Sequence, residues 1–267
     1  MTAEANKDAP VFAPGLFAGR HLLVTGGGTG IGFAIAREFA ALGARVTIAA
    51  RTEAKLQAAA DELRKLGTDA AWHAVNIRDE AQVEALFDDL ARGRGLPDFL
   101  VNNAGGQFAA AALDISANGF RAVIDLNLQG TWQMCRAFAR RAIAARSGGR
   151  IVNIVFSDIE GAPRFAHAAA ARAAVVNLTK TLAMEWARQG ILVNAVGPGT
   201  IDTEGIRQYA AEDSDRDVAS LPVPRLGTAR EVALAVAYLC SPAGDYSTGT
   251  VLVVDGGAAL TSRRMAE

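Results

Sequence analysis

An apolar run at residues 20–25 leads into the glycine-rich stretch TGGGTGIG, residues 25–32, which opens an amphipathic segment at residues 30–44. Gly26, Gly30 and Gly32 stand in this turn. Glycine lets such a turn adopt positive φ values and lets the backbone approach a pyrophosphate, which then lies at a helix N-terminus. A strand, a glycine turn and a helix in this order predict a dinucleotide-binding βα unit.

Strand-like and helix-like segments alternate from residue 20 onward, which predicts an α/β domain with a parallel sheet. The expected strands are residues 20–25, 45–50, 69–76, 98–106, 149–155, 191–200 and 249–257. We find no internal repeat or linker, so we expect one domain at residues 20–267, preceded by a flexible leader at residues 1–19. The polar, proline-bearing segment 202–227 is typical of a mobile loop over a substrate.

Charge and cysteine content exclude several other classes of protein. A formal net charge of −1 argues against a phosphate-binding surface for nucleic acid. Cys135 and Cys240 are too few and too far apart for a disulfide framework or a cysteine metal site, so we expect no metal and a cytoplasmic location. No apolar run reaches the ~18 residues that a membrane span needs, so we expect no membrane partner.

The end of the second strand indicates which nicotinamide cofactor is used. A carboxylate about 20 residues past the glycines would bind the ribose 2′-hydroxyl of NAD. The sequence TIAARTEAK has no carboxylate at the strand end and instead places Arg51 there, with Lys55 one helical turn on. Because arginine can bind a 2′-phosphate through two hydrogen bonds, we expect NADP.

Five motifs in order resemble those of the short-chain dehydrogenase/reductase family: TGGGTGIG, NNAGG (102–106), LNLQG (126–130), GPGTIDT (197–203) and VVDGG (253–257). The resemblance implies a single-domain Rossmann fold, with a seven-stranded parallel sheet, helices on both faces, and a homodimer or homotetramer. Asn76 stands where the family usually has an aspartate near the adenine. With the glycine turn and Arg51, the expected cofactor site comprises Gly26, Gly28, Thr29, Gly30, Ile31, Gly32, Arg51, Asn76, Ile77, Asn103, Ala104, Gly105, Arg172, Pro198, Gly199, Ile201 and Thr203.

The catalytic pattern departs from that of most family members, which carry a serine after the fifth strand and Tyr-x-x-x-Lys on the next helix. Here Ala168 stands at the tyrosine position and Arg172 at the lysine position, and the serine position falls on Phe156 or, by a one-residue slip, on Val155 or Ser157. The run AHAAAARAAVVNLTK is similar to the peroxisomal trans-2-enoyl-CoA reductases and, less closely, to the 2,4-dienoyl-CoA reductases. In the enoyl reductases the same helix carries a histidine, a small residue and an arginine, which His167, Ala168 and Arg172 match.

The missing tyrosine favours reduction of a C=C bond over reduction of a ketone. Ketone reduction creates an alkoxide that needs a positioned acid, a contribution of roughly 10²–10⁴-fold. Hydride addition to the β-carbon of an α,β-unsaturated thioester instead places the charge on the thioester oxygen, where hydrogen-bond donors stabilise it. We therefore expect an NADPH-dependent reductase of an enoyl thioester, with an acyl-CoA as its small-molecule substrate.

Three residues are expected to carry this chemistry. The resemblance implies that Asn127 orders a proton-relay water, and Arg172 would donate to the nicotinamide ribose. Asp158, after the fifth strand, would touch the substrate. Two alternatives stay open: an alcohol or carbonyl dehydrogenase whose acid is Asp158, His167 or Tyr209, and a dinucleotide-binding protein without catalysis.

Overall fold

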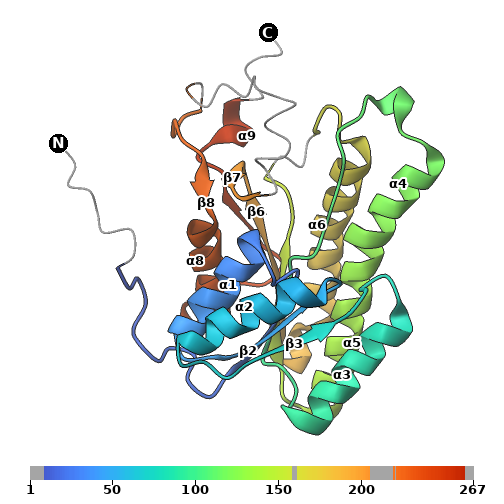
Figure 1. The fold of residues 1–267 in the computed structure, drawn as a ribbon. Coiled ribbons are helices and arrows are strands. Elements are labelled where there is room, and N and C mark those ends of the chain that lie inside the picture. Colours follow the sequence, from blue (N-terminus) through green and yellow to red (C-terminus); the bar gives the residue numbers. More distant parts are fainter. Residues whose placement is uncertain (1–8, 158–160, 205–218, 220, 262–267) are drawn as a thin grey trace, which may run out of the picture.

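The computed structural model describes residues 9–157, 161–204, 219 and 221–261, and its centre is a parallel sheet (Figure 1). The strands lie in the order β3-β2-β1-β4-β5-β6-β9. This confirms the expected seven-stranded Rossmann fold. In chain order the strands are β1 (His21–Thr25), β2 (Arg45–Ala50), β3 (Ala70–Ala74), β4 (Phe99–Asn102), β5 (Gly149–Ile154), β6 (Ile191–Pro198) and β9 (Val251–Val254).

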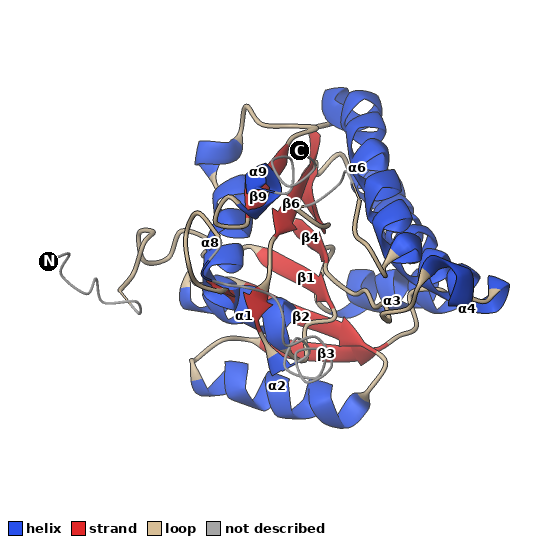
Figure 2. Ribbon diagram, turned by 90° about the horizontal axis from the view of Figure 1, so that it is seen from above, coloured by secondary structure: helices blue, strands red, loops and turns tan. Residues whose placement is uncertain are grey.

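Helices cover both faces of the sheet, as Figure 2 shows from above. On one face lie α1 (Gly30–Ala41), α2 (Glu53–Lys65) and α8 (Ala229–Cys240), whose apolar side chains form one core cluster with the sheet. On the other face lie α3 (Glu80–Gly93), α5 (Gly130–Ala145) and α6 (Ala166–Trp186), which share a second cluster. The remaining described elements are α4 (Ala117–Ile124), α9 (Ala258–Thr261), a two-stranded sheet of β7 (Ile201–Asp202) and β8 (Gly227–Thr228), a π-helical turn (Asp125–Gln129), and 3-10 turns at Ala112–Asp114, Ala187–Gln189 and Pro242–Gly244.

Burial on both faces explains why the middle of the first strand, Leu22 to Val24, is an unbroken apolar run. Successive side chains of a strand point to opposite faces of the sheet. Accordingly, Leu22 and Val24 lie in the cluster with α1, α2 and α8, while Leu23 lies in the cluster with α3, α5 and α6. A parallel sheet covered on both sides therefore favours apolar residues at successive positions in the middle of this strand, while its two ends hold the buried polar residues His21 and Thr25.

The strand order places a crevice above the centre of the sheet. Strand β1 pairs with β2 on one side and with β4 on the other, so the order of the strands reverses there. In open parallel sheets, ligands bind at this reversal, outside the carboxyl ends of the strands. The loops that follow β1, β4, β5 and β6 all open at this edge.

The second half of the expected leader belongs to the packed domain. Phe17 is only 2% exposed, and its ring stacks on Phe39 of α1 with centroids 4.6 Å apart. Its amide also donates to the carbonyl of Leu42. The packed region thus begins before the expected boundary at residue 20, because an aromatic side chain in the leader fills the core.

His21 of β1 gives the fold a dependence on pH. Its Nε2 lies 2.8 Å from Oγ1 of Thr47 and its Nδ1 lies 3.2 Å from the carbonyl of Gly95. Burial lowers the pKa of His21 from 6.5 to about 4, and the nearby positive charges of Arg45 and Arg94 act in the same direction. The unfolded chain therefore binds a proton between pH 6.5 and pH 4 that the folded chain does not.

Acidification through this window should therefore lower the free energy of unfolding. We expect His21 alone to account for about 2 kcal/mol between pH 7 and pH 5, measured by urea denaturation at both values. A His21→Gln variant should lose this part of the pH dependence, whatever its stability at pH 7. Equal pH dependence in the two proteins would contradict the assignment.

Candidate active site

The glycine turn after β1 packs tightly against the chain that follows β4. Gly26 and Gly30 have φ values of +66° and +55°. A Cβ atom at position 32 would lie 2.3 Å from the Gly26 carbonyl oxygen and 2.5 Å from Nδ2 of Asn103. Asn103 Nδ2 itself donates to the carbonyls of Thr25 and Gly26. Only glycine therefore fits at position 32, and its role is to let the turn close.

The N-terminus of α1 faces the same turn and can hold a phosphate group. Its N-cap, Thr29, makes no side-chain capping hydrogen bond. The first N–H groups of the helix are therefore not satisfied by this cap, and together with the helix dipole they favour an anion. This is the arrangement that a pyrophosphate needs.

A cavity of about 530 Å³ lies at the carboxyl edge of the sheet, above the β1–β4 reversal. Of the seventeen residues expected to bind the cofactor, all line this cavity except Gly32, which supports the turn from behind. The cavity is also lined by residues that the sequence motifs do not indicate as cofactor-binding: Ala49, Ala50, Thr52, Lys55, Val75, Gly106, Gln107, Leu126, Ile154, Val155, Phe156 and Glu204. Most of them lie at or just after the ends of strands. The expected strand boundaries could therefore have identified them.

Arg51 and Lys55 carry the positive charge at one end of the cavity. Arg51 directly follows β2 and is exposed, and Lys55 lies in the first turns of α2. A Cβ atom at Gly28 would lie 3.6 Å from the Cβ and backbone of Lys55, so this helix faces the glycine turn. Neither side chain forms an ion pair within the described parts of the chain. Both charges are thus available to a ligand.

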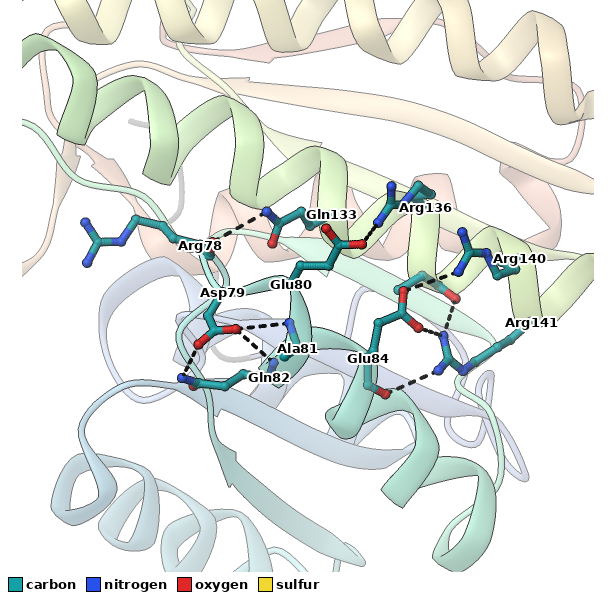
Figure 3. A network of polar contacts seen from close by, with 11 residues as sticks. Arg78, Asp79, Glu80, Ala81, Gln82, Glu84, Gln133, Arg136, Arg140 and Arg141 are labelled. Carbon is teal, nitrogen blue, oxygen red and sulfur yellow. Dashed lines mark hydrogen bonds and ion pairs between the residues drawn. The ribbon is translucent and has the colours of Figure 1, made fainter.

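A polar network at the start of α3 (Figure 3) adjoins the loop that carries Asn76 and Ile77. Asp79 caps α3 by accepting from the amides of Ala81 and Gln82, and Gln82 in turn accepts from the amide of Asn76. Helix α3 is tied to α5 by ion pairs, of which Arg141–Glu84 measures 2.8 Å and Arg136–Glu80 is another. The Oδ1 atom of Asn76 accepts from the backbone and the side chain of Arg78. The side-chain N–H groups of Asn76 are therefore the part of this side chain that can donate a hydrogen bond to a ligand.

The loops after β6 complete the cavity wall on the other side of the glycine turn. Pro198, Gly199, Ile201 and Thr203 all line it. A Cβ atom at Gly199 would lie 2.8 Å from the Cα of Asp255, so the VVDGG segment leaves room there only for glycine.

Arg172 is a buried cation at the opposite end of the cavity from Arg51. It is 6% exposed, and its Nη1 donates to the carbonyl of Ile154 over 2.6 Å. Its guanidinium lies 5.8 Å from the ring centre of Phe156, and its Nη2 occupies the space that a side chain at Gly105 would need. Burial lowers the pKa of Arg172 from 12.5 to about 10, so the group stays charged at neutral pH.

No described carboxylate pairs with Arg172, and its Nε atom has no hydrogen-bond partner in the described structure. An unpaired buried cation is costly for folding. Its retention at a cavity wall is typical of a group that interacts with a ligand.

Asn127 fixes the loop next to this cation. It is fully buried in a π-helical turn, a feature frequent at functional sites. Its Nδ2 donates to the carbonyls of Gly106 and Val123, and its Oδ1 accepts from the amide of Gly106. Both amide hydrogens of Asn127 are therefore already used. Its side chain holds the Gly106 segment in place and has no further hydrogen to donate to a substrate.

Of the other residues considered for the catalytic step, the structure describes Ala168 and His167. Ala168 is fully buried in the first turns of α6 and offers no acid. His167 is also fully buried, and its Nδ1 accepts from the amide of Ala168. Asp158 and Tyr209 lie outside the described residues. Within the described residues, no group of three His, Cys, Asp or Glu side chains could hold a metal ion.

Comparison with known proteins matches this architecture. The family model described as enoyl-(acyl carrier protein) reductase matches residues 26–259. The rat peroxisomal 2,4-dienoyl-CoA reductase is 38% identical over 256 residues, which cover 94% of this chain and 87% of the rat protein. The chain belongs to the short-chain dehydrogenase/reductase family.

Solved structures of family members superimpose closely on this chain. A citronellol catabolism dehydrogenase of Pseudomonas aeruginosa PAO1 aligns with a TM-score of 0.84 and 38% identity, over 93% of this chain and 98% of that chain. A short-chain type dehydrogenase/reductase from Mycobacterium marinum aligns with a TM-score of 0.83 and 33% identity, over 90% and 95% of the two chains. As a short-chain dehydrogenase/reductase, this protein is an oxidoreductase that uses a nicotinamide dinucleotide, and its glycine turn and cavity fit that cofactor.

Among the residues that the structure describes, no helix has both the length and the apolar character to cross a membrane.

Proposed function

We propose that this protein is an NADPH-dependent reductase that transfers hydride to the C=C bond of an enoyl thioester. The observation that carries the proposal is Ala168. It stands where most family members have the tyrosine that protonates an alkoxide, and it is fully buried. The names of the 2,4-dienoyl-CoA reductases among the relatives give an unsaturated acyl-CoA as the substrate that they reduce. This supports a C=C bond as the target here.

The walls near α6 suit a thioester enolate better than an alkoxide. Leu126 and Phe156 line that end of the cavity and supply apolar contacts, while Arg172 supplies a fixed positive charge. A low-dielectric site strengthens the attraction between this cation and a developing enolate oxygen. The enolate carbon can then take its proton from water or a weak acid, which removes the need for a strong acid at position 168.

The cofactor, when bound, supplies the hydride, and the residues of the chain bind and orient it. Arg51 would hold the 2′-phosphate of NADPH, and Arg172 would donate to the nicotinamide ribose. Asn127 keeps the Gly106 segment in position through three hydrogen bonds, so that the cavity wall is preformed. Such preorganisation is the main means by which a protein accelerates a charge-forming step.

We also propose a homodimer or homotetramer in the cytoplasm. Ile143 of α5 and Met184 of α6 are 39% and 76% exposed, and contact with a second subunit would cover them. Cys135 and Cys240 are both free and buried, in keeping with a reducing compartment. Some relatives are named peroxisomal, and a peroxisome is the alternative location.

The reaction class can be tested with a panel of substrates. Purified protein is mixed with NADPH and either trans-2-enoyl-CoAs or ketones of matched chain length, and NADPH absorbance is followed. We expect turnover with the enoyl-CoAs and at least ~10²-fold less with the ketones, in line with the value of a positioned acid. Turnover of ketones or alcohols alone would establish the dehydrogenase alternative. Tight NADPH binding without turnover on any substrate would establish the non-catalytic alternative.

A further inference from the structure

Three aromatic side chains cluster beside the substrate end of the cavity. We call Phe108, Phe120 and His167 the aromatic wall. Gly106 and Gln107 line the cavity, and Phe108 is the next residue along the chain. After β4 this segment runs up beside α6 to the start of α4 (Figure 1), and the amide of Ala110 donates to the carbonyl of Arg164, just ahead of α6. The aromatic wall therefore continues the surface of the cavity outward.

The wall is rigid on its inner side. The Phe108 ring packs edge-to-face against His167, with centroids 4.4 Å apart and an interplanar angle of 77°. A Cβ atom at Gly119 would lie only 2.9 Å from Cζ of Phe108, so glycine in α4 makes room for this ring. The Phe120 ring lies 6.5 Å from His167. Phe108 is thus held between the first turns of α4 and α6.

His167 is an uncharged ring that packs beside the two phenylalanine rings. It is fully buried, and this burial lowers its pKa, partly opposed by the Phe165 carbonyl. Its Nδ1 accepts from a backbone amide, and its Nε2 has no hydrogen-bond partner in the described part of the chain. A neutral imidazole in such surroundings contributes packing to the wall without placing a charge behind it.

The outer side of the wall is open. Phe108 is 39% exposed and Phe120 is 40% exposed, and Leu113 on the same segment is fully exposed. Fixed aromatic rings that stay this exposed next to a cavity are typical of a surface that binds an apolar ligand. Leu126 and Phe156 are apolar residues of the cavity lining, and Gly106 and Gln107 of the same lining lead along the chain to Phe108.

We propose that Phe108 and Phe120 bind the alkyl chain of the substrate and set the preferred chain length. This inference rests on the proposed function, because it takes the ligand to be an enoyl thioester whose reacting carbons lie near Arg172. From there the alkyl chain extends past Gly106 and Gln107 onto the two rings. Each further methylene covered by the wall should raise binding by about three- to fourfold.

The test is the ratio of kcat/KM for trans-2-dodecenoyl-CoA to that for trans-2-butenoyl-CoA, measured by NADPH oxidation. We expect the Phe120→Ala variant to lower this ratio by roughly tenfold, the value of about two buried methylenes. Phe120→Leu should restore most of it, and Phe108→Leu should lower it in the same direction. Tyr238→Ala on α8 is the matched control, because Tyr238 is also 39% exposed and lies outside the wall.

A binding measurement separates this inference from the proposed reaction. Titration calorimetry with dodecanoyl-CoA and butanoyl-CoA, on the protein saturated with NADP⁺, gives the chain-length preference without turnover. A preference for dodecanoyl-CoA that Phe120→Ala removes and Tyr238→Ala keeps would support the wall, even if no enoyl-CoA were reduced. An unchanged preference in Phe120→Ala, or no preference in the original protein, would overturn it, even if enoyl-CoAs of every length were reduced.

Discussion

Replacement of Arg172 by methionine should lower kcat/KM for an enoyl-CoA by about 10²–10³-fold, the usual cost of losing one preorganised donor to a developing oxyanion. Arg172 is the buried positive charge at the end of the cavity where Ala168 leaves no acid. Arg172→Lys keeps the charge and should stay within about tenfold of the original protein. The loss in Arg172→Met should appear mainly in kcat, because the charge acts on the enolate more than on the neutral substrate.

Thermal unfolding of the same variant distinguishes this role from a structural one. Removing a buried charge that has no described carboxylate partner should leave Tm unchanged or raise it, since the unpaired charge is costly to bury. Arg140→Met is the matched control, because Arg140 is 64% exposed and forms only a 3.7 Å ion pair with Glu84. A loss of activity in Arg172→Met that merely follows a fall in Tm, or equal activities of the two variants, would refute the assignment.

Arg51→Ala should weaken NADPH binding by about 10–100-fold and NADH binding by less than about threefold. Hydrogen bonds between a guanidinium and a phosphate are charge-assisted, and Arg51 forms no ion pair in the described structure that would compete with a ligand. The dissociation constants can be measured by the fluorescence of the reduced nicotinamide. NADPH binding to the original protein should also weaken as salt rises, because Arg51 is exposed.

Arg64→Ala on α2, the helix that follows Arg51, is the control for Arg51. Arg64 already pairs with Asp61 over 2.7 Å and does not line the cavity. It should leave both dissociation constants within about twofold of their original values. If Arg51→Ala weakened NADPH and NADH equally, the physical reason for assigning NADP would be gone.

Much of the cofactor cavity could be predicted from the sequence because it follows from strand ends. Parallel strands that end at one edge bring their following loops together, so TGGGTGIG, NNAGG and GPGTIDT converge without any further information. Gly32 belongs to the expected cofactor site but does not line the cavity. Its role comes from a close approach of the Gly26 carbonyl that only the folded backbone reveals.

Other features depend on tertiary contacts that no local pattern carries. The sequence places Arg172 one helical turn after Ala168, but only the fold shows that no carboxylate of the described residues pairs with it. The saturated amide of Asn127 results from a π-helical turn, which has no sequence period of its own. Phe108 and Phe120 come from an irregular segment and a short helix, and they meet only because both pack near His167. Strands β7 and β8 are two residues each, too short to give a pattern.

The fate of the transferred hydride tests the central claim most directly. Protein is incubated with trans-2-enoyl-CoA and NADPH that carries deuterium at C4 of the nicotinamide, with the transferable position labelled, and the product is examined by NMR and mass spectrometry. We predict a saturated acyl-CoA with one deuterium on the β-carbon and a solvent-derived hydrogen on the α-carbon. No label in the acyl chain, together with deuterium on the carbinol carbon of the alcohol when a ketone of matched chain length replaces the enoyl-CoA, would contradict the proposed reaction.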